Sequence, residues 1–162
     1  IASSGLAVNT YKKMLLGVVF AGSYNLILSI FENNGIEPLK FDNVYKVPLG
    51  SLGNPNFMSA YLGIFGTILF VLYFQYTKAK SKSFLIVISF ALAIYVIMAT
   101  KSIQGLLTLL AGVGIASVFL LHGSGYKRIS KVLFIGYALG SILFGSALLS
   151  RGPLSARMLL RT

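Results

Sequence analysis

The stretch GSLGNPNFMSAYLGIFGTILFVLYFQY, residues 50–76, joins a polar turn to a long run that contains no charged side chain. A helix needs about 20 mainly apolar residues to cross a bilayer, and residues 57–76 provide that length. Periodicity does not separate a helix from a strand in a run this apolar, but a membrane strand needs only about ten residues and alternates. The stretch therefore predicts a membrane-spanning helix that begins at a rigid polar turn.

The whole chain has the composition of an integral membrane protein. Of its 162 residues, 56% are hydrophobic and only 10% are charged, whereas soluble domains carry about 25% charged residues. A soluble chain of this size could not bury so much apolar surface. We therefore expect an all-α polytopic transmembrane bundle, with residues 1–162 forming a single transmembrane domain. Five runs are the expected spans: residues 14–31, 57–76, 84–100, 103–121 and 132–149.

The charged residues lie mainly between these runs. The net charge is +11, with 14 Lys and Arg residues against 3 acidic residues. In a soluble protein this excess would suggest nucleic-acid binding, but basic residues beside apolar spans set topology and meet anionic lipids, so we expect lipid partners and no nucleic acid. The basic, acid-free loops at 77–83 and 122–131 are predicted to be cytoplasmic. The turn at 53–56, the turn at Lys101 and the arginine-bearing tail then face outside.

Metal, disulfide and common catalytic motifs are missing from the sequence. The chain has no cysteine, which excludes disulfides, and its single histidine, His122, has no nearby ligand partners for a metal site. The sequence also contains no catalytic dyad or triad and no nucleotide-binding fingerprint, so we expect no cofactor. The chain begins with Ile1 rather than Met, and we interpret it as an internal fragment or a trimmed form of a longer polypeptide.

The first candidate for a binding site is the polar turn before the second run. Asn54 can cap the helix and Pro55 suits the first helical position, which by itself explains the turn in structural terms. The alternative is functional, because free N–H groups and a partial positive charge at a helix start suit a phosphate. In that interpretation Asn56 adds donors and acceptors for sugar hydroxyls.

The second and third candidates are also on the predicted outer side. Lys101 either extends to the lipid headgroups or, with Ser102 and Gln104, lines an outward-facing cavity. Arg157 and Arg161 are four residues apart, so they share one face of a helix. They either lie at headgroup level or hold a phosphate through bidentate hydrogen bonds.

The order of these elements resembles the O-antigen ligase and O-antigen polymerase family of membrane proteins, over about residues 47–162. GSLGNPNFMSAYLG is similar to the family's GxfGNPNxxAxyL motif, TKSIQGLLTLL to its TxSRGa motif, and SARMLLRT to the start of its RxxxW segment. The arginine of the second motif is replaced here, where Ile103 or Gln104 stands, and Lys101 is the nearby cation. Arg161 best matches an arginine at the entrance of the family's large outer loop.

The resemblance implies an integral membrane glycosyltransferase of the bacterial inner membrane, with its site facing the periplasm. Such an enzyme moves a glycan from undecaprenyl diphosphate, its lipid-linked donor, to a lipid or glycan acceptor without a metal. Residues 1–162 would form part of the scaffold and one edge of the site, and not a complete catalytic site. Two alternatives stay open: a membrane transporter similar to the inorganic-carbon-transporter-like relatives, and a non-catalytic membrane scaffold. Only Asn25 and Gln75 are strongly polar within the spans, which argues against a charged transport pathway.

Overall fold

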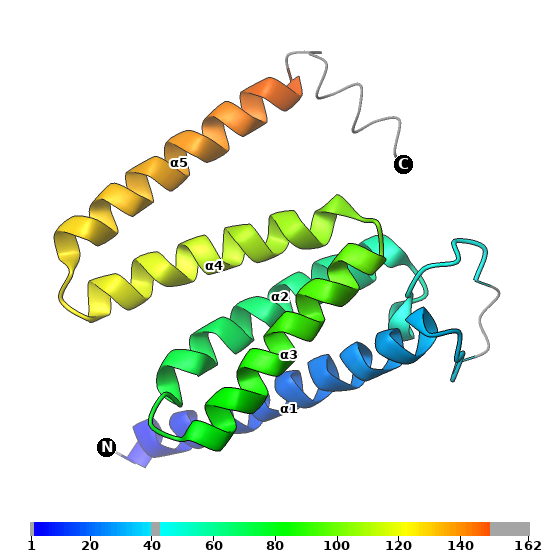
Figure 1. Ribbon diagram of the computed structural model, residues 1–162. Coiled ribbons are helices and arrows are strands. Elements are labelled where there is room, and N and C mark those ends of the chain that lie inside the picture. Colours follow the sequence, from blue (N-terminus) through cyan, green and yellow to red (C-terminus); the bar gives the residue numbers. More distant parts are fainter. Residues whose placement is uncertain (1, 40–42, 150–162) are drawn as a thin grey trace. The chain divides into compact units, whose positions relative to one another are not determined.

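The computed structural model describes the backbone of residues 2–39 and 43–149. Within these ranges the chain forms helices and no strand (Figure 1), which confirms the predicted all-α class. In Figure 1, α2 runs antiparallel to α1, and α3 runs antiparallel to α2. The elements are α1 (Ala2–Asn33), the short 3₁₀ helix η1 (Gly50–Leu52), α2 (Pro55–Gln75), α3 (Lys80–Ala99), α4 (Ile103–Gly123) and α5 (Lys127–Leu149).

The described helices include four that are long and apolar enough to cross a membrane, so the chain has the character of a multi-pass membrane protein. They correspond to the first four expected spans, and their ends differ from the expected bounds by no more than five residues. Most of the difference is extension, because polar residues can continue a helix into the headgroup region. The fifth expected span, residues 132–149, falls within the single helix α5. The four spanning segments are Asn9–Asn33, Pro55–Gln75, Lys80–Ala99 and Ile103–Gly123.

The chain divides into two compact units, Ile1–Val113 and Gly114–Thr162. In the first unit α1, α2 and α3 pack side by side (Figure 1). Their core is built around one face of α2, because its apolar side chains recur at intervals of three and four residues. These α2 residues are Met58, Leu62, Phe65 and Leu69, and they are joined in the core by Leu26, Ala93, Val96, Ile97 and Leu109 from the other helices.

Glycines allow the helices of the first unit to approach closely. A side chain at Gly22 of α1 would overlap the ring of Phe65 in α2. A Cβ at Gly63 of α2 would lie 2.6 Å from the backbone oxygen of Gly105 in α4. Close packing of this kind is typical of membrane helices, whose interfaces are enriched in small residues.

The second unit is a helical hairpin made by the end of α4 and by α5. Gly125, with a φ of 90°, permits the reversal between the two helices. Ser130 is buried in α5, and its Oγ donates a hydrogen bond to the Val118 carbonyl oxygen at 2.9 Å. This bond ties the two arms of the hairpin together and satisfies a polar side chain in an apolar setting.

Candidate functional site

The loop before α2 is fastened to the end of α1 by one carboxylate. Glu32 Oε2 accepts hydrogen bonds from the backbone nitrogens of Leu49 at 2.7 Å and Gly50 at 2.8 Å. Hydrogen bonds to an ionised acceptor are about twice as strong as those between neutral groups. Glu32 therefore fixes the point from which η1 and the polar turn leave the first helix.

A second anchor is Asn25, which is 6% exposed within α1. Its Oδ1 accepts from the Ser51 backbone nitrogen at 3.0 Å and from Ser51 Oγ at 2.7 Å, while its Nδ2 donates to the Ala21 carbonyl oxygen at 3.1 Å. Asn25 was noted in the sequence only as a polar residue inside a span. Its bonds show that it binds the following loop, which explains why an amide is tolerated at this depth.

The polar turn itself is a helix cap. Asn54 precedes α2 in an extended conformation, and its Oδ1 accepts from the backbone nitrogens of Asn56 at 2.9 Å and Phe57 at 3.4 Å. Pro55 occupies the first helical position, and Gly53 adopts a φ of 66°. The capping interpretation is thus confirmed. Because Asn54 Oδ1 already takes two backbone donors, the turn offers a ligand the Asn54 amide nitrogen and the half-buried Asn56 side chain.

The second polar turn lies between α3 and α4, where the sequence predicted a break at Lys101. Lys101 has a φ of 57°, the left-handed conformation that glycine usually adopts after a helix. Thr100 Oγ1 donates to the Ile97 carbonyl oxygen at 2.7 Å, and Ser102 Oγ accepts from the Gln104 backbone nitrogen at 3.3 Å. The turn is therefore well ordered by local bonds, and it leaves the Lys101 and Gln104 side chains exposed.

Ser59 joins the two turns. Its Oγ accepts a hydrogen bond from the Gly105 backbone nitrogen at 3.0 Å and donates to the Ser102 carbonyl oxygen at 3.3 Å. Ser59 is fully buried one turn into α2, and both of its partners belong to the start of α4 or the residue before it. The polar turns at 53–56 and 100–105 therefore lie at the same end of the first unit.

Four of the six site residues predicted from the sequence lie close to the N-terminal ends of α2 and α4, which Ser59 connects. They are Asn54, Asn56, Lys101 and Gln104. Arg157 and Arg161 lie outside the described residues. No group of His, Asp and Glu side chains that could hold a metal is found in the described ranges. Ser59 was not among the candidates from the sequence, although a serine one turn into a membrane helix, with a glycine in the facing segment, is typical of close packing.

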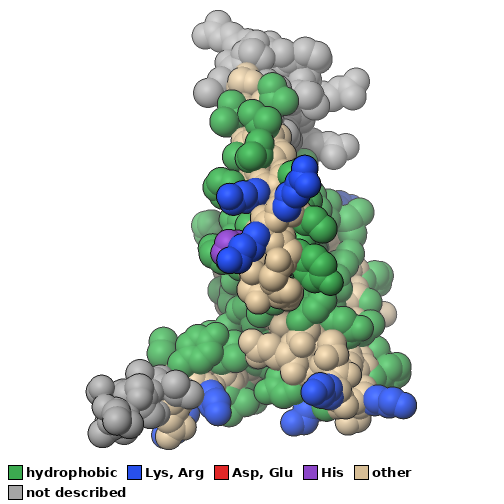
Figure 2. Space-filling model, turned by 90° about the vertical axis from the view of Figure 1, so that its left-hand side faces the viewer, with side chains coloured by type: hydrophobic (Ala, Val, Ile, Leu, Met, Phe, Trp, Pro, Cys, Tyr) green, Lys and Arg blue, Asp and Glu red, His purple; other side chains and the backbone are tan. Residues whose placement is uncertain are grey.

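The basic side chains are separate from the acidic ones. Figure 2 shows Lys and Arg side chains in separate groups among hydrophobic side chains, and no Asp or Glu of the described residues is seen in this view. This separation agrees with the sequence, in which all three acidic residues fall within residues 32–42. Basic side chains at the ends of apolar helices are expected where a membrane protein meets the headgroups of the cytoplasmic leaflet.

No protein-family model, no curated protein sequence and no solved structure matches the chain. The likeness to O-antigen ligases and polymerases therefore depends on the motifs in residues 47–162.

Proposed function

We propose that the chain belongs to a membrane glycosyltransferase of the O-antigen ligase or polymerase type. It would move a glycan from undecaprenyl diphosphate to a lipid or glycan acceptor, in the bacterial inner membrane and with its site facing the periplasm. One observation carries the proposal: the Ser59 hydrogen bonds hold the GNPN turn and the TKSIQG turn at one end of the first unit. Two motifs that resemble the family are thereby neighbours in space as well as in order.

The chemistry expected of this end is the stabilisation of a departing diphosphate. Negative charge develops on the leaving group, and fixed cations and hydrogen-bond donors lower the barrier when they are held in place beforehand. Lys101 would supply the cation, and the side-chain amides of Asn54, Asn56 and Gln104 would supply donors to phosphate or sugar oxygens. This division of roles also accounts for a lysine in place of the second-motif arginine.

The backbone of Lys101 is strained, and its side chain is unpaired among the described residues. A side chain with a Cβ in the left-handed conformation costs about 1 kcal/mol, and glycine would avoid that cost. The Lys101 side chain is exposed and makes no ion pair or hydrogen bond within the described part of the chain, so it is free to bind a phosphate.

The test is Lys101→Gly in the full protein, with transfer of a glycan from its undecaprenyl-diphosphate donor measured in membrane vesicles. We expect the rate to fall by at least roughly tenfold because the cation at this turn is lost. We also expect the thermal unfolding midpoint to rise, because glycine relieves about 1 kcal/mol of backbone strain. A loss of activity together with a gain in stability would separate a binding role from a structural one.

Lys46 provides the matched control. It is also exposed and has a positive φ of 53°, but it lies in the loop before η1. Lys46→Gly should stabilise the protein to a similar extent and leave transfer unchanged. Unchanged transfer in Lys101→Gly would contradict the proposed role of this lysine. Bicarbonate uptake by vesicles that show no glycan transfer would contradict the enzyme and favour a transporter.

A further inference from the structure

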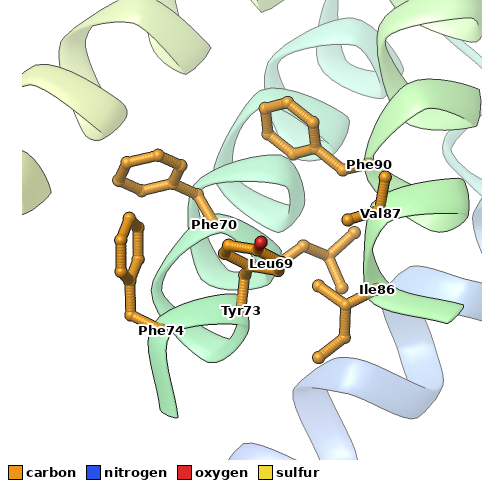
Figure 3. Close-up of a pocket in the computed structure, with 7 residues that line it drawn as sticks. All are labelled: Leu69, Phe70, Tyr73, Phe74, Ile86, Val87 and Phe90. Carbon is orange, nitrogen blue, oxygen red and sulfur yellow. The ribbon is translucent and has the colours of Figure 1, made fainter. Parts of the chain in front are cut away.

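An apolar groove lies between the end of α2 and the start of α3, at the opposite end of these helices from the two polar turns. Its volume is about 230 Å³, and all seven lining residues are apolar or aromatic. Figure 3 shows Leu69 and Tyr73 of α2 and Ile86, Val87 and Phe90 of α3 around the space between the two helices. Both helices are long and apolar enough to span a membrane, so we expect this groove to face lipid rather than water.

The α2 wall of the groove is an aromatic cluster. The ring centroids of Phe70 and Phe74 are 5.2 Å apart, and those of Tyr73 and Phe74 are 5.5 Å apart, both in edge-to-face geometry. Tyr73 is 38% exposed and Phe74 is 49% exposed. Aromatic residues near the end of a spanning helix are typical of the headgroup boundary, where one side of the ring meets acyl chains.

A cation lies at the end of this groove. Lys82, Ile86 and Phe90 follow one another at intervals of four residues on α3, so Lys82 continues the stripe that lines the groove. Its Nζ lies 5.2 Å from the centroid of the ring of Tyr76, the residue that follows α2. The lysine therefore sits above the junction of the two helices, within about one helical turn of the apolar lining.

The charge around this position is uniformly positive. Lys78 and Lys80 accompany Lys82 in the turn and first helical residues, all three are exposed, and none makes an ion pair in the described part of the chain. No side chain caps the start of α3 after Ala79, and its first turn contains no acidic residue. A ligand that fits an apolar groove with a basic end is therefore an amphiphile with an apolar tail and an anionic head.

We propose that this groove binds an anionic phospholipid of the membrane. An acyl chain lies against Phe70, Tyr73 and Phe90, and the headgroup phosphate is held at Lys82 with Lys78 and Lys80 beside it. The aromatic wall determines the position of the chain, and the lysines determine the preference for a negative headgroup. The proposal is independent of glycan transfer, because it involves the opposite ends of α2 and α3.

The absence of tryptophan from the sequence allows a site-specific test. The chain is placed in lipid nanodiscs with Phe74→Trp as a fluorescent reporter, and quenching is compared between brominated phosphatidylglycerol and brominated phosphatidylcholine. We expect half-maximal quenching at a mole fraction at least about fivefold lower for phosphatidylglycerol, the factor expected for one lysine near an anionic headgroup. The preference should shrink in high salt, because salt screens exposed charges.

Control variants distinguish this site from general lipid contact. Ile64→Trp places the reporter on the same helix at a position that is 54% exposed, about 15 Å away, and should show no preference. Replacing Lys78, Lys80 and Lys82 by glutamine should abolish the preference at position 74. The matched triple glutamine variant of Lys127, Arg128 and Lys131 removes the same charge elsewhere and should retain it.

Three outcomes would overturn the proposal. Equal quenching by the two lipids would mean that bulk lipid fills the groove without selection. No quenching by either lipid would mean that protein covers it. A preference that persists at high salt and in the Lys78, Lys80 and Lys82 variant would show that the lysines are not the cause.

Discussion

Gly105→Ala is expected to lower the free energy of unfolding by about 3 kcal/mol, because α2 and α4 meet at this residue with no room for a methyl group. The added Cβ would overlap Ser59 Oγ and lie 2.8 Å from the Ser59 carbonyl carbon. A backbone atom cannot rotate out of the way as a side chain can, so the helices must separate. Their separation would break both hydrogen bonds of Ser59 and uncouple the two polar turns.

The measurement for Gly105→Ala is the thermal unfolding midpoint of the purified protein in detergent, followed by circular dichroism. Gly136→Ala is the matched control, because a Cβ at Gly136 meets nothing within 4 Å among the described residues. This control should be neutral or slightly stabilising, since alanine favours a helix over glycine by up to about 1 kcal/mol. Equal midpoints for the two variants would show that α2 and α4 do not pack closely through Gly105.

Glu32→Ala is expected to destabilise the protein by about 2 kcal/mol and to loosen the loop before α2. The substitution leaves the backbone nitrogens of Leu49 and Gly50 without their acceptor, although both residues are buried. An unpaired buried donor costs more than the bond itself contributes, because it has lost its water as well. The effect should extend along η1 toward the Asn54 cap.

Hydrogen exchange resolves this loosening residue by residue. In Glu32→Ala the amides of Leu49 and Gly50 should exchange at least roughly tenfold faster, which corresponds to about 1.4 kcal/mol of local protection. Glu37→Ala is the control, since Glu37 is exposed and makes no hydrogen bond within the described residues. Unchanged exchange at both amides in Glu32→Ala would contradict the claim that Glu32 holds the loop in place.

The class of fold and the helix positions could be predicted because they depend on properties of short stretches. The length of an apolar run identifies a spanning helix, and the turn at Lys101 follows because residues 84–121 are too long for one crossing. The Asn54 cap could also be predicted, since a cap involves only residues two or three positions away. Each of these features is local, so an unaligned sequence is enough to find it.

The packing that joins the turns could not be predicted in this way. Ser59 and Gly105 are 46 positions apart, and nothing in either local sequence identifies the other as its partner. The same holds for Glu32 and Asn25, because their side-chain oxygens accept hydrogen bonds from loop residues 17 to 26 positions later in the chain. A carboxylate near a helix end is usually assigned to the membrane surface, and only the fold shows that this one holds a loop.

The most direct test is labelling with a membrane-impermeant maleimide, because the chain contains no cysteine and each introduced thiol reports one position. Leu52→Cys, Gln104→Cys and Thr77→Cys are all at exposed sites. We predict that positions 52 and 104 are labelled from the same side of sealed vesicles and that position 77 is labelled only from the other. Labelling of positions 52 and 104 from opposite sides would contradict the joined turns and the site built on them.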